Sequence, residues 1–328
     1  MGKRLLAVLS LASVPAFAQS VTADLVVNVT DPSGGVIPSA ALELRQVATN
    51  AKFNGQTDVN GNHIFVQVRP GDYELGVTAS GFGAQTVSGI RLVIGQRARV
   101  NVRMELDTVA ETVTVAADQA VLLNAESAAV GQVIESETIV ELPLNGRNFL
   151  QLAQISAGAV PIGSGVSPAT SWTGRPDSSL SIADGRESGN SFLLNGIETR
   201  NARFGSVGIR PSVDAIQEFK VQRSTFTAEF GRSAAVVNTT LRSGTNDLHG
   251  TAFEFLRNKV LDANNFFNNA SSRPRAPFAQ NNFGAAVGGP LALPKLYDGR
   301  DRTFWFFNYE GFRQREGITS TALYPSRA

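Results

Sequence analysis

The side chains that could carry chemistry are few and scattered in this sequence. Its two histidines, His63 and His249, lie in different segments, and cysteine is absent from the 328 residues. A histidine-rich metal site needs several ligands close together, and a hydrolytic triad would need one of these histidines as its base. Without cysteine there is no disulfide framework and no thiol chemistry. The sequence therefore predicts no enzyme, no metal centre and no bound cofactor.

One stretch, residues 58–62 (DVNGN), begins like a calcium-binding loop. Such a loop needs glycine after its third ligand and a carboxylate at its end. His63 and Arg69 occupy those positions here. The dipeptide Asn60-Gly61 is instead a strong signal for a tight hairpin turn. We therefore predict a turn and no cation site.

Residues 110–118 (AETVTVAAD) could carry chemistry of another kind, which is backbone hydrogen bonding to a partner. Their centre alternates threonine with valine, a pattern that favours an extended strand. An unpaired strand offers a row of donors and acceptors to the edge of another protein's sheet. The alternatives are a last strand of the preceding domain or a plain linker.

Composition and charge narrow the class of protein. The 29 basic residues nearly balance the 28 acidic ones, giving a formal net charge of +1, so no nucleic-acid partner is implied. The chain has 31 glycines, and threonine and valine dominate its periodic stretches. This composition predicts mainly β structure with many turns.

The N-terminus has the pattern of a secretory signal peptide, residues 1–18. Lys3 and Arg4 precede an apolar run at 5–14, and Ala-Phe-Ala at 16–18 matches a small-x-small cleavage site. A first core helix is the alternative, but Pro15 and the short apolar run disfavour it. No later apolar run approaches the ~18 residues of a spanning helix. The chain is predicted to be exported and to enter a membrane only as β structure.

Three further segments have distinct strand patterns. Residues 19–106 contain six short alternating runs separated by Gly and Pro turns, which predict a β-sandwich of about seven strands: 25–30, 41–47, 63–68, 73–79, 90–94 and 97–106. Residues 119–245 predict a small α+β domain with a short amphipathic helix at 149–155. Its strands are expected at 180–182, 191–194, 218–222 and 234–242, with a hairpin at Asn195-Gly196, a helical turn at 213–216 and a bend at Phe230-Gly231.

Residues 246–328 carry alternating strands with an aromatic face, predicted at 249–257, 282–288 and 303–312. Trp305, Phe307 and Tyr309 share one face of the last of these, and Asn308 and Glu310 lie on the other. A soluble sheet with one buried face would show the same pattern, as would a membrane barrel that is apolar outside and polar inside.

Several motifs resemble known families. DPSGGVIPSAALEL (31–44) and TDVNGNHIFVQVRPGDYELGVTASGF (57–82) resemble the carboxypeptidase-regulatory-like sandwich, which has a transthyretin-like fold. ELPLNGRNFLQLAQISAGAV (141–160), SFLLNGIETR (191–200) and AIQEFKVQRSTFTAEFGRSAAVVNTTLRSGTN (215–246) resemble the plug domain of TonB-dependent outer-membrane transporters. GGPL (288–291) and RTFWFFNYEGFR (302–313) resemble the first barrel strands of the Oar-like subfamily.

The resemblance implies an outer-membrane receptor of a Gram-negative-type bacterium that takes up an unknown extracellular substrate. Its partners would be TonB, with the inner-membrane energising complex, and outer-membrane lipid. In this family a short segment ahead of the plug is the TonB box, and the matching residues are Glu111, Thr112, Val113, Thr114 and Val115. The resemblance assigns Asn195, Gly196, Phe230 and Gly231 to plug architecture. The linker that holds the box would span residues 107–118.

The sequence departs from the family in one respect. About three barrel strands fit before Ala328, whereas a plugged transporter barrel has about 22. We therefore expect the first strands of an incomplete transmembrane β-barrel, in the N-terminal portion of a transporter. A second hypothesis is an exported binding or adhesion protein that uses the sandwich as an interaction module. A third, a peptidase-associated protein, would need a catalytic domain, and the HxxE metal-binding pattern is absent from the sequence.

Overall fold

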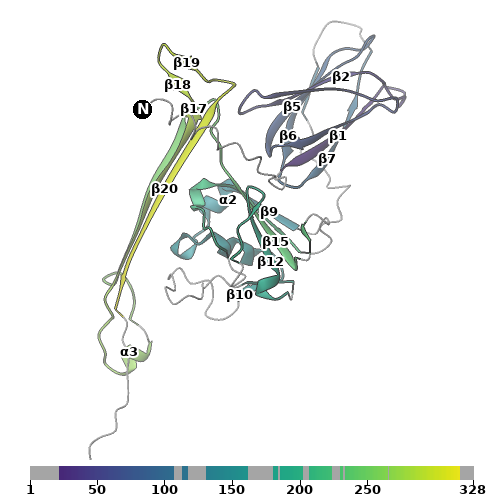
Figure 1. Cartoon of the computed structure of the whole chain (residues 1–328). Helices are drawn as coiled ribbons and strands as arrows, with labels where there is room; N and C mark the ends of the chain where they lie inside the picture. Colours follow the sequence, from purple (N-terminus) through teal and green to yellow (C-terminus); the bar gives the residue numbers. More distant parts are fainter. Residues whose placement is uncertain are drawn as a thin grey trace, which may run out of the picture.

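The computed structural model describes residues 22–106, 113–116, 131–161, 180–183, 185–201, 207–223, 230–231, 233–264 and 266–317. Three parts follow one another along the chain: a β-sandwich, a central domain with a mixed sheet, and a long three-stranded sheet (Figure 1). The predicted signal peptide lies outside the described residues. Within them, none of the helices has the length and hydropathy needed to cross a membrane.

The sandwich consists of two sheets that face each other. One has the order β4-β1-β7 and the other β3-β2-β5-β6-β8. The strands are β1 (Ala23–Thr30), β2 (Ala41–Gln46), β3 (Lys52–Gln56), β4 (Asn62–Val68), β5 (Gly71–Thr78), β6 (Gln85–Leu92), β7 (Arg97–Arg103) and β8 (Val113–Ala116). Burial alternates strictly along β7, so one face enters the core. Leu25, Leu44 and Tyr73 are among the fully buried members of that core.

The turn at 58–62 uses its carboxylate internally. Oδ1 of Asp58 accepts hydrogen bonds from the backbone N–H groups of Asn60 and Asn62, each at 2.8 Å. Asp58 therefore closes the tight turn between β3 and β4, as the Asn-Gly signal predicts. Among the described residues no group of three or more His, Asp or Glu side chains could hold a metal ion.

The central domain has a five-stranded sheet with the order β13-β12-β15-β14-β9. Its strands are β9 (Gly131–Glu135), β12 (Asn190–Leu194), β13 (Ile197–Glu198), β14 (Ile216–Gln222) and β15 (Ala235–Leu241), with a separate pair β10 (Ala159–Pro161) and β11 (Leu180–Ile182). Its helical segments are α2 (Ser136–Glu141) and the 3₁₀ turns η1 (Asn145–Arg147), η2 (Phe149–Ile155), η3 (Glu187–Gly189) and η4 (Val213–Ala215). Apolar residues of η2 and β14, including Leu150, Leu152 and Phe219, form the core between them.

The predicted hairpin and bend of this domain are present, whereas the predicted amphipathic helix is a helix of another type. Asn195 and Gly196 both have positive φ, 49° and 79°, which is the conformation of the expected tight hairpin. Gly231 also has a positive φ of 62°, as a bend requires. The segment predicted as an amphipathic helix is the 3₁₀ helix η2, and its last apolar residue, Ile155, is 47% exposed rather than buried.

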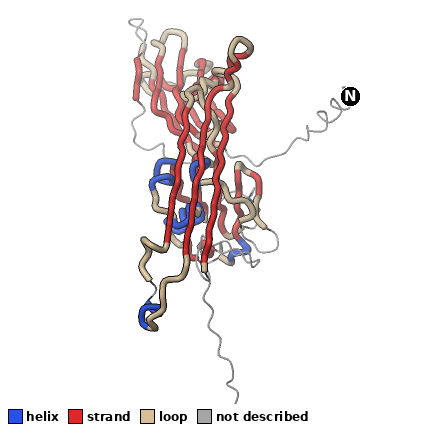
Figure 2. Tube along the Cα trace, turned by 90° about the vertical axis from the view of Figure 1, so that its left-hand side faces the viewer, coloured by secondary structure: helices blue, strands red, loops and turns tan. Residues whose placement is uncertain are grey.

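The long sheet contains three antiparallel strands, β16 (His249–Asn258), β17 (Phe278–Pro290) and β20 (Phe304–Glu316), which run side by side along their length (Figure 2). Helix α3 (Phe266–Ala270) lies in the connection at one end, and the small hairpin of β18 (Ala292–Leu293) and β19 (Tyr297–Asp298) lies in the connection at the other (Figure 1). The sandwich lies at the β18–β19 end.

The two faces of β17 and β20 differ as the sequence predicts, whereas β16 is reversed, with Glu254 on the outer face and Phe253 and Phe255 on the inner one. Trp305, Phe307 and Tyr309 are 36%, 58% and 56% exposed on the outer face. On the opposite face Asn282 and Ala286 are buried at 1% and 4%. Small and polar side chains of β17 therefore point toward the central domain together with Phe253 and Phe255 of β16, while the aromatic face of β20 is left uncovered.

Candidate functional site

Strand β8 contains part of the predicted partner-binding segment. Val113, Thr114 and Val115 lie in it, whereas Glu111 and Thr112 lie outside the described residues. β8 pairs in parallel with β6, from Gln85 opposite Val113 to Ser88 opposite Ala116. The expectation of an unpaired segment is therefore wrong for Val113–Ala116, because the edge of β6 offers the same backbone groups that an external sheet would offer.

β8 is nevertheless the last strand of its sheet. Among the described strands it has a neighbour only on the β6 side. The second edge of a terminal strand presents unpaired N–H and C=O groups to an incoming strand. A partner could bind this edge directly or could take β8 away from β6.

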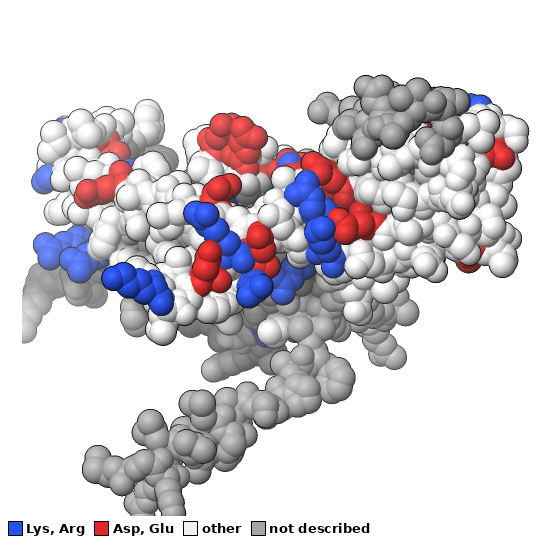
Figure 3. All heavy atoms as spheres, turned by 90° about the horizontal axis from the view of Figure 1, so that it is seen from above, with Lys and Arg blue, Asp and Glu red and all other residues white. Residues whose placement is uncertain are grey.

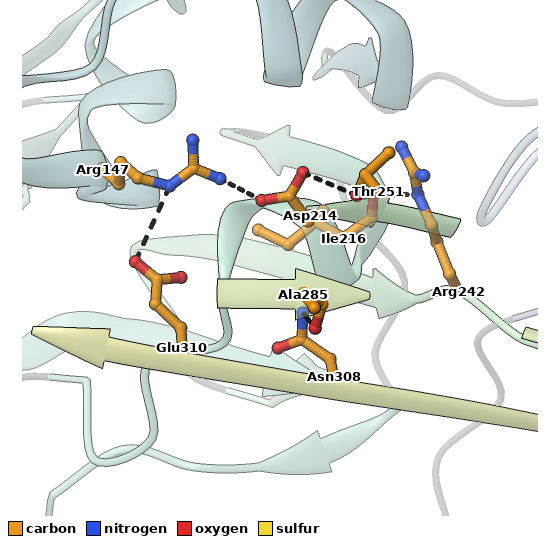
Figure 4. Close-up of polar contacts among 8 residues, drawn as sticks. All are labelled: Arg147, Asp214, Ile216, Arg242, Thr251, Ala285, Asn308 and Glu310. Carbon is orange, nitrogen blue, oxygen red and sulfur yellow. Dashed lines mark hydrogen bonds and ion pairs between the residues drawn. The ribbon is translucent and has the colours of Figure 1, made fainter. Parts of the chain in front are cut away.

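A cluster of charges joins the central domain to the long sheet. Arg147 of η1 forms an ion pair with Asp214 of η4, and its Nε lies 3.7 Å from Oε1 of Glu310 on β20 (Figure 4). Oγ1 of Thr251 on β16 donates to Oδ1 of Asp214 at 3.5 Å. The side chains of Arg147, Asp214 and Glu310 are only 12%, 6% and 19% exposed. We call these three residues the seam cluster.

Aromatic rings hold the cation of the seam cluster in place. The guanidinium carbon of Arg147 lies 4.2 Å from the ring centre of Phe253 and 5.1 Å from that of Phe255, both on β16. A planar guanidinium can stack on a ring and still donate at its edges, which an ammonium cannot do. Arg147 itself has a positive φ of 54°, directly after Gly146 at 61°. The LNGRN turn therefore aims this side chain at the long sheet.

Gly284 makes room for that arrangement. A Cβ at this position would lie 2.4 Å from the carbonyl oxygen of Tyr309 and 2.6 Å from Cζ of Phe253. Phe253 lies directly across from Gly284 in the β16–β17 ladder. Its ring can therefore lie flat across β17 only because Gly284 lacks a side chain.

A cavity of about 400 Å³ lies beside the seam cluster, between the α2–η1 segment and strands β16 and β17. Leu144, Arg147 and Phe255 line it together with Asn282. Neither amide atom of Asn282 has a hydrogen-bond partner among the described residues, although the residue is 1% exposed. The cavity wall is thus polar at this point and can accept a water molecule or a polar group.

A second charged cluster joins the central domain to the sandwich. Oε2 of Glu218 accepts the backbone N–H of Ile94 at 2.8 Å, and Nζ of Lys220 donates to the carbonyl oxygens of Ile94 at 2.8 Å and Gly95 at 3.1 Å. Burial raises the pKa of Glu218 to about 6, an effect that the hydrogen bond from Ile94 opposes. Burial also lowers the pKa of Lys220 to about 8. We call Glu218 and Lys220 the docking pair.

Sequence reasoning missed both clusters. Their signal is local and weak: Glu218 and Lys220 are alternate residues of a strand, which indicates a solvent-exposed face, and Arg147 sits in a turn. The structure does not bring Asn195, Gly196, Phe230 and Gly231 together with either cluster; Asn195 instead accepts a hydrogen bond from the backbone of Leu241 at 2.9 Å. On the face seen in Figure 3 acidic and basic side chains are interspersed, and neither sign forms a large patch.

Comparisons with known proteins agree with this architecture. A family model described as "Carboxypeptidase regulatory-like domain" matches residues 24–105, and one described as "Outer membrane beta barrel domain" matches residues 240–328. Over 313 residues, 89% of this chain, the sequence is 26% identical to the "TonB-dependent transporter Oar" of Myxococcus xanthus. The chain is a homologue of this transporter.

The match covers 26% of Oar, so the chain spans about a quarter of that relative's length. Solved structures that resemble it include the siderophore receptor PirA from Acinetobacter baumannii, at 19% identity and a TM-score of 0.36 over 49% of this chain and 22% of that one. Another is the outer membrane transporter YddB from Escherichia coli, at 16% identity and a TM-score of 0.39 over 49% of this chain and 24% of that one. The family matches confirm the mainly β fold class, with its regulatory-like sandwich and outer-membrane barrel domain.

Proposed function

We propose that the chain carries the sandwich, the plug and the first barrel strands of a TonB-dependent outer-membrane receptor that takes up an unidentified substrate. One observation carries the proposal: β20 turns Trp305, Phe307 and Tyr309 outward, while the opposite face of the long sheet packs against the central domain around the buried Asn282 and Ala286. That is the arrangement of a lipid-facing wall around a plug. Homology to Oar along 89% of the chain supports it.

The orientation follows from the connections of the long sheet. Barrels of this class have short periplasmic turns and longer extracellular loops. The connection that holds α3 runs from 259 to 277, and the one that holds β18 and β19 runs from 291 to 303. The α3 end is therefore assigned to the cell exterior. The sandwich and β8, at the other end, are assigned to the periplasm, where TonB would reach them.

In this mechanism the substrate binds at the exterior side of plug and barrel, and TonB pairs with the segment from Glu111 to Val115. Force derived from the inner-membrane energising complex then displaces or remodels the plug. Backbone pairing explains why the segment needs only extended, β-branched residues. The rival hypothesis of an exported binding protein leaves the exposed aromatic face of β20 without a role.

The experiment deletes residues 111–115 from the receptor and measures energised uptake and substrate binding at the cell surface separately. We expect uptake to be lost while surface binding is retained. A matched control replaces Val113 and Val115 with threonine, which keeps the β-branched shape and the backbone donors, and it should retain uptake. Unchanged uptake after the deletion would refute the assignment of the segment.

A further inference from the structure

The sandwich grips the central domain through a short turn between β6 and β7. Residues 93–96 form this turn, and Ile94 at its tip is 0% exposed. The docking pair holds both sides of the Ile94 peptide backbone, since Glu218 accepts from its N–H and Lys220 donates to its carbonyl oxygen. Charged groups bonded to backbone from another module are directional and leave little freedom to slide.

The fit of this contact is close. Glu218 and Lys220 are 3% and 6% exposed although both are ionisable. Gly95 has a φ of +60°, and a Cβ there would lie 3.2 Å from Nζ of Lys220. At the margin Arg91 of β6 forms a 2.9 Å ion pair with Glu135 of β9. The contact is therefore a shaped socket with a charged rim, unlike the loose contact of a tethered module.

A second contact joins the sandwich to the end of the long sheet. Oδ1 of Asp301, in the turn before β20, accepts from the amides of Asn50 at 2.8 Å and Asn246 at 2.6 Å. The backbone N–H of Asp301 donates to Oδ1 of Asn246 at 2.8 Å, and the N–H of Asn246 donates to the carbonyl oxygen of Ala48 at 3.0 Å. The β2–β3 turn, the start of the long sheet and the β19–β20 turn therefore meet at one carboxylate.

We propose that the sandwich is a clamp that holds the central domain against the barrel wall from the periplasmic side. It grips strand β14 of the central domain at the docking pair and the end of the long sheet at Asp301. The two grips belong to one rigid sandwich, so the central domain cannot shift relative to the long sheet without breaking one of them.

Strand β8 connects this clamp to the partner, a step that rests on the proposed function. β8 bonds to residues 85–88 of β6, and β6 continues directly into the turn that carries Ile94. A pull on β8 is therefore transmitted along β6 to the docking pair. In this way the sandwich is opened by the same partner that displaces the plug.

The absence of cysteine makes a distance measurement straightforward. Single cysteines for spin labels are introduced in pairs at exposed positions: Val59 on the sandwich (82% exposed), Ile197 on the central domain (55%) and Leu296 beside β19 (81%). Pulsed electron paramagnetic resonance of the full chain in detergent gives the three distance distributions. We expect each to be narrow in the parent.

The test variant combines Lys220→Met with Asp301→Ala, which removes one side chain from each grip. All three distributions should broaden, including the one between Ile197 and Leu296, which involves no sandwich position. The matched control combines Lys259→Met with Asp262→Ala, two residues of the connection at the α3 end of the long sheet, away from both grips. It should keep the narrow distributions, and circular dichroism should show that both variants are folded.

Two results would overturn the clamp. One is a test variant in which the sandwich moves while the distance between Ile197 and Leu296 stays narrow, since the sandwich would then be a passenger. The other is a parent with broad distances from Val59. Adding the periplasmic domain of TonB should broaden the parent's distances, and narrow distances with TonB bound would refute the opening step. A failure of TonB to bind would count against the proposed function alone, because the first measurements use no partner.

Discussion

Two charged clusters hold the central domain to its neighbours, and they differ in how their buried charges are paired. In the seam cluster a buried cation is matched by two carboxylates and stacked on two rings, so each charge finds its partner in another side chain. In the docking pair the charges bond largely to the backbone of a turn on a separate module. Separation from the long sheet would leave Arg147 paired with Asp214 and would remove Glu310 and the two rings, whereas separation from the sandwich would return both members of the docking pair to water. The ion pair at the seam therefore lies within one domain, and the docking contact depends entirely on two.

Replacing Asp214 by asparagine should cause the largest loss of stability. It leaves the Arg147 guanidinium buried beside only one distant carboxylate, and removing one partner of a buried ion pair costs about 3–5 kcal/mol. Urea unfolding followed by circular dichroism measures the loss. Asp262→Asn, in the partly exposed pair with Arg257, makes the same chemical change and should cost no more than about 1 kcal/mol. Equal losses in the two variants would mean that the buried pair of the seam cluster stabilises the protein no more than a partly exposed pair does.

Gly284→Ala should be the next largest change, because it acts on the ring that supports Arg147. The added methyl group meets the backbone of β20 as well as the Phe253 ring, and the backbone cannot rotate away. We expect a loss of about 1–3 kcal/mol in the same unfolding measurement. Ala285→Gly, on the exposed face of the same strand, is the control for a changed backbone propensity. Stability equal to that of the parent would show that the ring does not need this space.

The docking pair should respond to pH between about 4.5 and 6. The pKa of Glu218 is raised on burial from 4.5 to about 6, so the docked state binds the proton more tightly. Protonation of Glu218 therefore favours docking. This contribution is fully present below pH 4.5 and is lost as the pH rises through about 6. The difference amounts to about 2 kcal/mol. Distance distributions from Val59 should therefore narrow when the pH falls from 7 to 5.

Glu218→Gln provides the control for this pH effect. Glutamine can still accept the N–H of Ile94, but it does not titrate. Glu218 faces Lys220 on its own strand, Glu135 on β9 and Arg91 on the sandwich, and these remain in the variant. A pH response that persists in Glu218→Gln would have to come from another group and would contradict the assignment.

Arg91→Gln should have the smallest effect. It tests whether the exposed ion pair at the margin or the buried docking pair supplies most of the binding energy between the sandwich and the central domain. Its ion pair with Glu135 has side chains that are 50% and 44% exposed, and such pairs contribute about 0.2–1 kcal/mol. Distances from Val59 should hardly change, in contrast with Lys220→Met. If Arg91→Gln loosens the sandwich as much as Lys220→Met does, the charged rim rather than the buried socket carries the contact.

Most strands could be predicted because apolar residues recur at every second position of a half-buried strand. β7 and β20 are examples, and the Asn195-Gly196 hairpin has a turn signal of its own. Five strands were missed: β3 (KFNGQ), β9 (GQVIE), and the two- or three-residue strands β10, β18 and β19. Four of the five β3 residues are exposed, and β9 is a short sheet edge with a single buried residue, Ile134, so neither shows apolar alternation.

The charged clusters could not be predicted, for a different reason. Arg147 and Asp214 are 67 residues apart in the chain, and Ile94 and Glu218 are 124 apart. A single charged residue in a strand indicates exposure unless its partner is known, and that partner is set by packing between domains. The pairing of β8 with β6 is similar, because strand propensity alone does not say which sheet a strand will join.

The parallel pairing of β8 has a consequence for the cell envelope. Whenever β8 leaves the sheet, residues 85–88 of β6 become a bare ladder of amide and carbonyl groups, the kind of surface on which neighbouring chains stack and precipitate. Each engagement of β8 by the proposed partner would thus expose an adhesive edge. Rapid return of β8 would then cover this edge again and restore the pairing of β8 with β6.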